Sequence, residues 1–174
     1  GVGSQPDALL YRDYHDTEWG RPLHGTQALF ERVSLEAFQS GLSWLIILRK
    51  RENFRSAFAG FDIEAVARFG EKDIDRLLAD PGIVRNRAKI EATIANARAI
   101  VDADVDLDAL LWSFAPAQRA RPADLSQVPA TSPESVAMAK ELKRRGLRFV
   151  GPTTAYALMQ ATGMVDDHIA TCWR

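Results

Sequence analysis

The stretch that decides the fold runs from Gln27 to Phe58 and reads QALFERVSLEAFQSGLSWLIILRKRENFRSAF. Its first half carries apolar side chains at helical spacing: Leu29, Phe30, Val33, Ala37 and Phe38. Because these side chains return to one face every third or fourth position, residues 27–40 predict a buried helix with Thr26 as its N-cap. Gly41 interrupts the pattern, and residues 42–58 predict a second helix that is apolar at its start and basic later.

Outward from this stretch, helical periodicity continues in other segments. We expect helices over residues 63–69, 71–78, 85–101, 134–145 and 153–161. Four aspartates within residues 102–108 predict a turn into a short helix, the proline-rich stretch 115–133 predicts a loop between two lobes, and residues from 166 onward predict a final helical turn. No strand-like alternation of useful length is present in the sequence. The expected fold is an all-α bundle that forms a single domain over residues 1–174.

Charge and hydropathy exclude several function classes. The 174 residues hold 22 Lys plus Arg and 23 Asp plus Glu, a net charge of −1, so any nucleic-acid site must be local. The longest uncharged apolar run, residues 42–48, falls far short of the roughly 20 residues that cross a bilayer, and no signal peptide is visible from Gly1 onward. The single cysteine, Cys172, excludes an internal disulfide. We expect a cytoplasmic protein without membrane contact.

Glu36 places a carboxylate on the inward face of the first helix. It shares a seam with Leu29, Val33 and Ser40, at steps of three or four residues. A buried carboxylate must be hydrogen-bonded, paired with a charge or protonated. Two interpretations follow. Glu36 forms a salt bridge with an arginine at the edge of the core, or it is an anionic group kept in an apolar pocket to receive a cationic ligand.

Aromatic residues favour the second interpretation. Tyr11, Tyr14 and Trp19 lie in one short segment, and Trp44 lies two helical turns beyond Glu36. Taken singly, such residues are ordinarily part of a hydrophobic core. Two rings flanking a carboxylate nevertheless suit a flat, positively charged heteroaromatic ring, which they would hold by stacking, cation–π attraction and ionic hydrogen bonds.

Candidate metal ligands lie at the two ends of the chain. His168 and Cys172 are spaced i, i+4, which places both on one face of a helical turn, and His15 offers a third ligand. The alternative is a hydrogen-bonded histidine beside a buried cysteine. A fourth ligand is not evident, since the chain has no other Cys and His24 is its only other His.

A basic segment leads into a turn near the C-terminus. Within residues 140–148 five positive side chains oppose one negative, Glu141, which gives a net charge of +4. Such a run is usually only a solvated helix face. Here it leads to Gly151, Pro152 and Thr153, where the proline suits the first helical position and the exposed amides of the next helix would bind a phosphate.

The turn resembles a known DNA-binding hairpin. The string from Val150 to Ala155 is similar to the hairpin of helix-hairpin-helix modules, with Phe149 standing where such hairpins commonly have their first glycine. The helix-hairpin-helix element would span about residues 134–161.

Strings along the whole chain resemble one family. They are Tyr14-His15-Asp16-x-Glu18-Trp19-Gly20, Leu35-Glu36-Ala37-Phe38-Gln39-Ser40-Gly41-Leu42-Ser43-Trp44, Lys50-Arg51-Glu52-Asn53-Phe54-Arg55, Leu111-Trp112-Ser113-Phe114, Arg144-Arg145-Gly146-Leu147-Arg148-Phe149-Val150-Gly151 and Asp167-His168. In this order they are similar to the 3-methyladenine DNA glycosylase I family. The resemblance implies an all-α helix-hairpin-helix enzyme of base-excision repair, which hydrolyses the N-glycosidic bond of N3-methyladenine in alkylated DNA.

The resemblance also implies roles for individual residues. Glu36 would be the catalytic residue and would hydrogen-bond the flipped base, and the base would be walled by Tyr11, Tyr14, Trp19 and Trp44. His15, His168 and Cys172 would hold a structural zinc that ties the two termini together. In the family a Cys and a nearby Trp precede the segment that begins here at Gly1 and supply the fourth zinc ligand and another pocket wall. Neither residue is present in the sequence given: truncation would explain both absences, and a complete chain would leave the zinc site without one protein ligand.

For the DNA we expect contacts that do not read sequence. Leu42, at the Gly41 turn, would wedge into the stack that the flipped base has left. Phosphates would be held by Arg148, Gly151 and Thr153, with help from Arg49, Lys50 and Arg51. The expected partners are double-stranded alkylated DNA and free 3-methyladenine as product, and the protein is expected to act as a monomer.

Two other functions stay open at this point. A non-catalytic helix-hairpin-helix module that recognises damaged or bent DNA would need the basic element around residues 140–154 but no aromatic and acidic pocket. A zinc hydrolase would need a metal site with an open position and a bound water.

Overall fold

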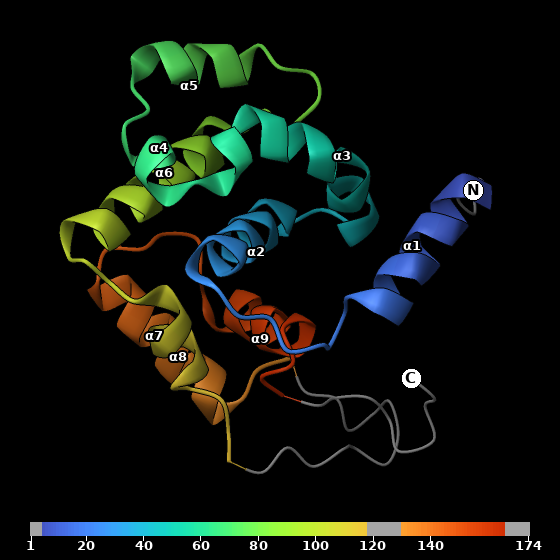
Figure 1. Cartoon of the computed structure of the whole chain (residues 1–174), viewed down its shortest axis with the longest axis vertical. Coiled ribbons are helices and arrows are strands. Elements are labelled where there is room, and N and C mark those ends of the chain that lie inside the picture. The colour runs from blue at the N-terminus through green and yellow to red at the C-terminus, as the bar shows by residue number, and fades with distance from the viewer. Residues whose placement is uncertain (1–4, 118–129, 166–174) are drawn as a thin grey trace.

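A computed structural model describes residues 5–117 and 130–165, and every regular element in these ranges is a helix. The helices are α1 (Gln5–Thr17), α2 (Thr26–Gln39), α3 (Trp44–Ala57), the short 3-10 helix η1 (Ala59–Phe61), α4 (Ile63–Ala67), α5 (Glu71–Leu78), α6 (Arg87–Asp102), α7 (Leu107–Trp112), α8 (Pro133–Arg144) and α9 (Pro152–Ala161). Figure 1 shows α2 in the middle of the bundle, with the other helices around it. The all-α prediction is confirmed.

Helix α2 forms the centre of the core. Its buried residues run almost without a break from Leu29 to Phe38, and it contacts α3, α6, α7 and α9. Phe38 packs against Phe54 and Phe58, with ring centroids 4.8 and 5.9 Å away. Each fully buried phenyl side chain contributes about 1.5–3 kcal/mol of transfer free energy. Because α2 is enclosed on several sides, Glu36 is carried toward the interior.

Polar side chains set where most helices begin. The residues that precede five helices each accept a hydrogen bond from a backbone amide of the first turn: Ser43, Asp62, Asn86, Asp106 and Ser132. Such bonds satisfy amides that have no partner inside the helix. The prediction of Thr26 as a cap is wrong, because Thr26 is the first residue of α2 and Gly25 holds the cap position. Gly25 has a φ of 103°, which glycine adopts without strain, and its amide donates to the Asp108 carboxylate at 2.6 Å.

Helix α1 is not among the helices that apolar periodicity predicts. It is fastened to α3 by ion pairs instead of a wide apolar face. Arg49 Nε donates to Asp7 Oδ1 at 2.8 Å, and Arg51 Nη1 donates to Glu18 Oε1 at 2.7 Å, just beyond the end of α1. These pairs place the aromatic segment around Tyr14 against the start of α3.

The remaining predicted helices lie within a few residues of the observed ones. Helix α3 begins at Trp44 rather than at residue 42, and α6 spans Arg87–Asp102 rather than 85–101. Helices α8 and α9 pack against each other as the predicted hairpin pair. Most of the predicted loop at 115–133, and the final helical turn from 166, lie outside the described residues. None of the helices in the described ranges is long and apolar enough to cross a membrane.

Candidate functional site: an aromatic pocket and a hairpin

A cavity of about 370 Å³ opens where α1, α2, α3 and α9 meet. Ten residues line it: Tyr11, Tyr14, His15, Trp19, Arg32, Glu36, Gln39, Trp44, Ala157 and Gln160. The set includes all five residues that the sequence analysis assigned to a base, and it adds Arg32, Gln39 and two residues of α9. The volume is suited to a small aromatic ligand.

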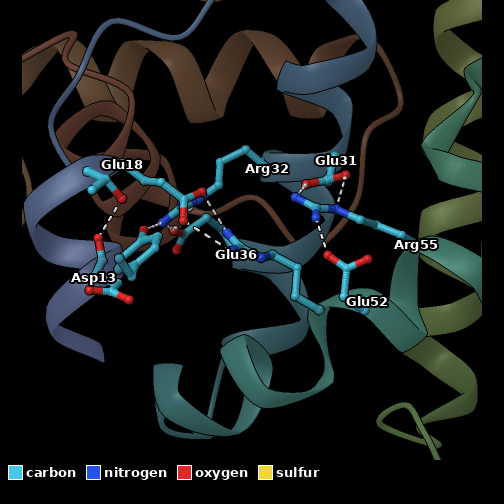
Figure 2. Close-up of polar contacts among 10 residues, drawn as sticks. Asp13, Glu18, Glu31, Arg32, Glu36, Glu52 and Arg55 are labelled. Atoms are coloured by element: carbon cyan, nitrogen blue, oxygen red, sulfur yellow. Dashed lines mark hydrogen bonds and ion pairs between the residues drawn. The ribbon is translucent and has the colours of Figure 1, made fainter. Parts of the chain in front are cut away.

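Glu36 lies at the back of this cavity and is paired with Arg32, one helical turn before it. The Glu36 side chain is 5% exposed and the Arg32 side chain 12%. Arg32 Nη2 and Nε donate to the same oxygen, Oε1 of Glu36, at 2.8 and 3.0 Å. The salt-bridge interpretation of Glu36 is therefore confirmed, and so is its position in a pocket walled by rings. Figure 2 shows the pair on α2.

The aromatic walls stand close to the pair. The rings of Tyr14 and Trp44 lie 5.5 Å apart between centroids, at an angle of 44°. The Arg32 guanidinium carbon lies 4.3 Å from the Trp44 ring centroid and 5.1 Å from that of Tyr14, and Arg32 also donates to the Tyr14 hydroxyl. A planar cation is thus already seated in the free protein between two rings and a carboxylate.

Burial raises the pKa of both acidic groups in the pocket. It raises the pKa of the Glu36 carboxyl above its ordinary value, and the adjacent Arg32 guanidinium offsets part of this rise. Burial likewise raises the pKa of Tyr14 to about 12, so its hydroxyl stays neutral at physiological pH. The pocket therefore offers one carboxylate whose charge depends on its cationic neighbour.

Two polar atoms of the pocket residues have no hydrogen-bond partner among the described residues. Both hydrogen bonds that Glu36 accepts go to Oε1, so Oε2 can accept a bond from a ligand. The indole Nε1 of Trp44 is likewise unpartnered within the part of the chain that the structure describes, but it is buried and would have to be uncovered before it could donate to a ligand.

The turn at Gly41 and Leu42 lies at the edge of this pocket. Gly41 has a φ of 82°, and the backbone of Leu42 is fixed by Gln39, whose Nε2 donates to its carbonyl at 2.5 Å. Lys89 supports the turn from below, since its buried ammonium donates to the carbonyls of Phe38 and Ser40 at 2.8 and 2.6 Å. Leu42 is half-buried and packs on the core, and its role as a DNA wedge stays a prediction.

The hairpin between α8 and α9 forms a second concave surface, of about 820 Å³, on which Arg148 and Gly151 lie. Phe149, at the position of the missing glycine, has a φ of 62°. The backbone thus keeps a conformation that favours glycine, and Asn96 of α6 clamps it. Asn96 Nδ2 donates to the Arg148 carbonyl at 3.1 Å, and the Arg148 amide donates to Asn96 Oδ1 at 2.7 Å.

The predicted phosphate contacts on this hairpin are exposed. Gly151 is the N-cap of α9 and contributes no side-chain bond to the first amides, and Pro152 holds the first helical position as predicted. Arg148 and Thr153 lie on either side of it and face solvent. The arrangement leaves helix amides open to an anion. Part of the nearby basic charge is neutralised, because Glu141 accepts hydrogen bonds from Arg144.

Three cations expected to help on DNA have partners within the protein. Arg49 and Arg51 form the ion pairs to Asp7 and Glu18 described above, and Lys50 donates to the Pro81 carbonyl at 3.2 Å. Their first role in this structure is to hold α1 and the segment after α5 against α3.

Of the three predicted zinc ligands, only His15 belongs to the part of the chain that the structure describes. His168 and Cys172 lie outside the described residues. His15 lies in the pocket wall, where its ring stacks on Trp19 at 5.8 Å and its Nδ1 is 3.3 Å from Asp16 Oδ1. Within residues 5–117 and 130–165 no group of three His, Cys, Asp or Glu side chains could hold a metal. Zinc stays a prediction, and no chemical step below depends on it.

Sequence reasoning missed part of the pocket. The notable omission is Arg32, which the spacing of four residues before Glu36 would have named as the expected salt-bridge partner. Gln39 has the same kind of signal, three residues after Glu36. Ala157 and Gln160 carry none, since only the packing of α9 against α2 brings them to the cavity.

The family model, the similar sequences and the similar structures all point to methyladenine glycosylases. Residues 4–174 match the family model described as methyladenine glycosylase. DNA-3-methyladenine glycosylase 1 of Escherichia coli (strain K12) is 44% identical over 168 residues, covering 94% of this chain and 90% of that protein. A crystal structure of 3-methyladenine DNA glycosylase I superposes with a TM-score of 0.90 at 44% identity, over 99% of this chain and 96% of the other. The Staphylococcus aureus enzyme, solved to explain 3-methyladenine recognition, superposes with a TM-score of 0.88 at 34% identity, over 94% and 89%.

Proposed function

The chain belongs to the methyladenine glycosylase family, and from that premise we propose how it recognises N3-methyladenine in alkylated DNA and releases it. The activity is that of a base-excision repair glycosylase. The observation that carries the proposal is a cavity of about 370 Å³ in which a buried carboxylate, Glu36, stands among aromatic rings.

The chemistry of the substrate sets what the protein must supply. Methylation at N3 makes the adenine formally cationic, so the bond from C1′ to N9 already has a good leaving group. Little general-acid assistance is then needed, and the enzyme must mainly find, extrude and hold the damaged base. Extrusion costs a few kcal/mol and is least expensive for a base whose stacking and pairing are already impaired.

In the pocket, Glu36 is the group that favours the cationic base. Its Oε2 accepts a hydrogen bond from the adenine edge, while the carboxylate charge stabilises the positive ring in a site shielded from water. Tyr14 and Trp44 stack on or flank the ring, and Trp19 and Tyr11 close the mouth of the pocket. Water then attacks C1′, the bond to N9 breaks, and the electron pair leaves with the base, which departs as neutral 3-methyladenine. The attacking water gives up a proton to solvent and becomes the hydroxyl on C1′.

The rest of the molecule holds the DNA. Leu42, presented by the Gly41 turn, fills the gap left in the stack. Arg148, Gly151 and Thr153 bind phosphates near the hairpin without reading sequence, so DNA affinity falls steeply with salt. We propose that the enzyme works as a monomer in the cytoplasm.

A structural zinc joining the termini is the remaining proposal, supported by the resemblance and by the soft-ligand pair His168 and Cys172. When bound, it would supply a cross-link between chain ends rather than a reacting group. Metal analysis of the purified protein, with His168→Ala as the comparison, tests it. A metal content that the substitution does not lower would refute it.

Release of free base decides between the enzyme and a non-catalytic damage-binding module. The protein is incubated with N3-methylated duplex DNA, and the released bases are identified by chromatography. We expect 3-methyladenine to appear with time and nothing to be released from unmethylated DNA. Binding of the methylated duplex with no release would favour the module and refute the enzyme.

A further inference from the structure

Arg32 makes the three contacts that the proposed function gives to the methylated base. It pairs with Glu36, lies over the face of Trp44 and touches Tyr14. A guanidinium is planar, cationic and able to stack, so it resembles a positively charged purine in each property that this pocket reads. We infer that Arg32 is a resident competitor of the methylated base, which occupies the recognition site of the free enzyme and must withdraw when the base enters.

Geometry makes the two occupants of the Trp44 face mutually exclusive. The Arg32 guanidinium carbon lies 4.3 Å from the Trp44 centroid. Planar groups in contact are separated by about 3.5–4.0 Å, so a base inserted between them would need roughly 7 Å. The base can stack on this face of Trp44 only after the guanidinium has moved.

Charge leads to the same conclusion. With Arg32 in place the Glu36 charge is already neutralised, and a second cation would lie a few ångströms from the guanidinium in a site largely shielded from water. Like charges at that distance repel strongly at low dielectric. A methylated base gains the full attraction of Glu36 only when Arg32 is elsewhere.

The structure contains a place for Arg32 to go. A separate cavity, of about 290 Å³, is lined by Arg32 together with two acidic and two other basic residues, Glu18, Glu31, Arg51 and Arg55. The two carboxylates there are paired with Arg51 and Arg55. In the view of Figure 2, Arg32 and Glu36 are drawn between Glu18 on the left and Glu31 on the right. A change of rotamer would take the guanidinium from Glu36 into a cavity whose two carboxylates already have cationic partners, so the withdrawn state is the less favourable one in the free enzyme.

A base that enters the pocket must offset the free energy of the Arg32 contacts that it displaces, and this consequence rests on the proposed function of the pocket. An enzyme whose competent state is a minor population binds its ligand more weakly by that fraction. A normal neutral adenine, which gains little from Glu36, cannot offset the loss of the Arg32 contacts, whereas the cationic base replaces them. Arg32 is thus a specificity-determining residue.

Arg32→Met tests this inference, because methionine keeps a flexible chain of similar length without the charge. Affinity for free 3-methyladenine is followed by tryptophan fluorescence at the same pH for the parent and the variant. We expect a Kd about tenfold lower than that of the parent protein, corresponding to a resident state populated about nine times in ten. Arg87→Met, which removes an exposed arginine paired with Glu91, serves as the matched control and should leave the Kd unchanged.

A second measurement needs no substitution. In the parent protein the Nε–H proton resonance of Arg32 carries a ring-current shift from Trp44, and saturation with 3-methyladenine should move it toward the position of an unstacked arginine. An unchanged resonance at saturation, or an Arg32→Met protein that binds 3-methyladenine no tighter than its parent, would overturn the inference. Failure of the proposed function is seen separately, as a parent protein that neither binds nor releases 3-methyladenine.

Discussion

The base pocket and the α8–α9 hairpin solve two recognition problems with opposite physics. In the pocket the charged groups are buried and paired, as Glu36 is with Arg32. A ligand must therefore interact with Glu36 more favourably than Arg32 does. On the hairpin the backbone amides of α9 and the side chains of Arg148 and Thr153 are open to solvent. In the proposed function the first surface distinguishes a chemical lesion, and the second holds any duplex.

This separation teaches that chemical selectivity and DNA affinity are independent properties of the molecule. In the proposed function the pocket contacts the base alone, and the hairpin contacts phosphates alone. Substitutions in one region should therefore leave the readout of the other unchanged, and each prediction below uses that contrast.

Apart from the removal of the Glu36 charge, which is considered last, the largest effect is expected from Trp44→Ala. Stacking of a base on an aromatic ring is worth about 1–3 kcal/mol, so release of 3-methyladenine under single-turnover conditions should slow by about 10- to 100-fold. Trp44→Phe retains a ring and should recover most of the rate. Affinity for undamaged DNA, measured by fluorescence anisotropy, should be the same in all three proteins. A parallel loss of DNA affinity would show that the two regions are not independent.

Acidification should affect the pocket and spare the hairpin. Because burial raises the pKa of Glu36 above its ordinary value of 4.5, the single-turnover rate should fall on the acid side with an apparent pKa above that value, by about tenfold for each pH unit below it. The base in DNA is cationic throughout, so the limb reports the enzyme. A limb at or below pH 4.5, or an equal limb in the binding of undamaged DNA, would contradict this.

A methyl group at Gly151 should weaken only the hold on DNA. A Cβ there meets nothing within 4 Å and φ is ordinary, so Gly151→Ala should fold normally while crowding a bound phosphate. We expect DNA affinity to fall about fivefold, equivalent to about 1 kcal/mol of anion binding at a helix N-terminus. Gly70→Ala, at the equally open N-cap of α5, is the matched control. Equal losses in both variants, or weaker binding of free 3-methyladenine, would count against the assignment.

The smallest effect is expected from Asn96→Ala, which removes the clamp on the Arg148 backbone. Two hydrogen bonds are lost, so the free energy of unfolding should fall by about 1–2 kcal/mol and DNA affinity by about twofold as the hairpin loosens. Thr93→Val removes a bond within α6 that does not reach the hairpin and is the control. An Asn96→Ala protein with unaltered stability and DNA affinity would show that the clamp is dispensable.

Much of this fold follows from local patterns. The seam that carries Glu36 is buried because apolar residues flank it at helical spacing, and the caps at Asp62 and Asp106 form where short polar side chains precede apolar runs. The N-cap prediction that was wrong concerns a position fixed by a residue distant in the sequence. Gly25 replaces Thr26 as the cap of α2 because its amide reaches Asp108, far along the chain.

The residue types of the pocket could be predicted from the sequence, but the position of Arg32 inside it could not. The carboxylate of Glu36 and the aromatic side chains were visible as residue types. Helix α1 could not be predicted from apolar periodicity, because ion pairs to Arg49 and Arg51 hold it in place. The position of Arg32 over Trp44 depends on a rotamer, which spacing does not determine. His168 and Cys172 lie outside the described residues, so their pairing with His15 stays a prediction.

The most direct measurement is the single-turnover release of 3-methyladenine by Glu36→Gln, which keeps the shape of the side chain and removes its charge. We predict a rate at least about 30-fold below that of the parent, with circular dichroism and affinity for undamaged DNA unchanged, because truncating a buried charge pair costs about 2–5 kcal/mol. A folded Glu36→Gln protein that releases the base at the parent rate would contradict the role of the carboxylate in selecting the cationic lesion.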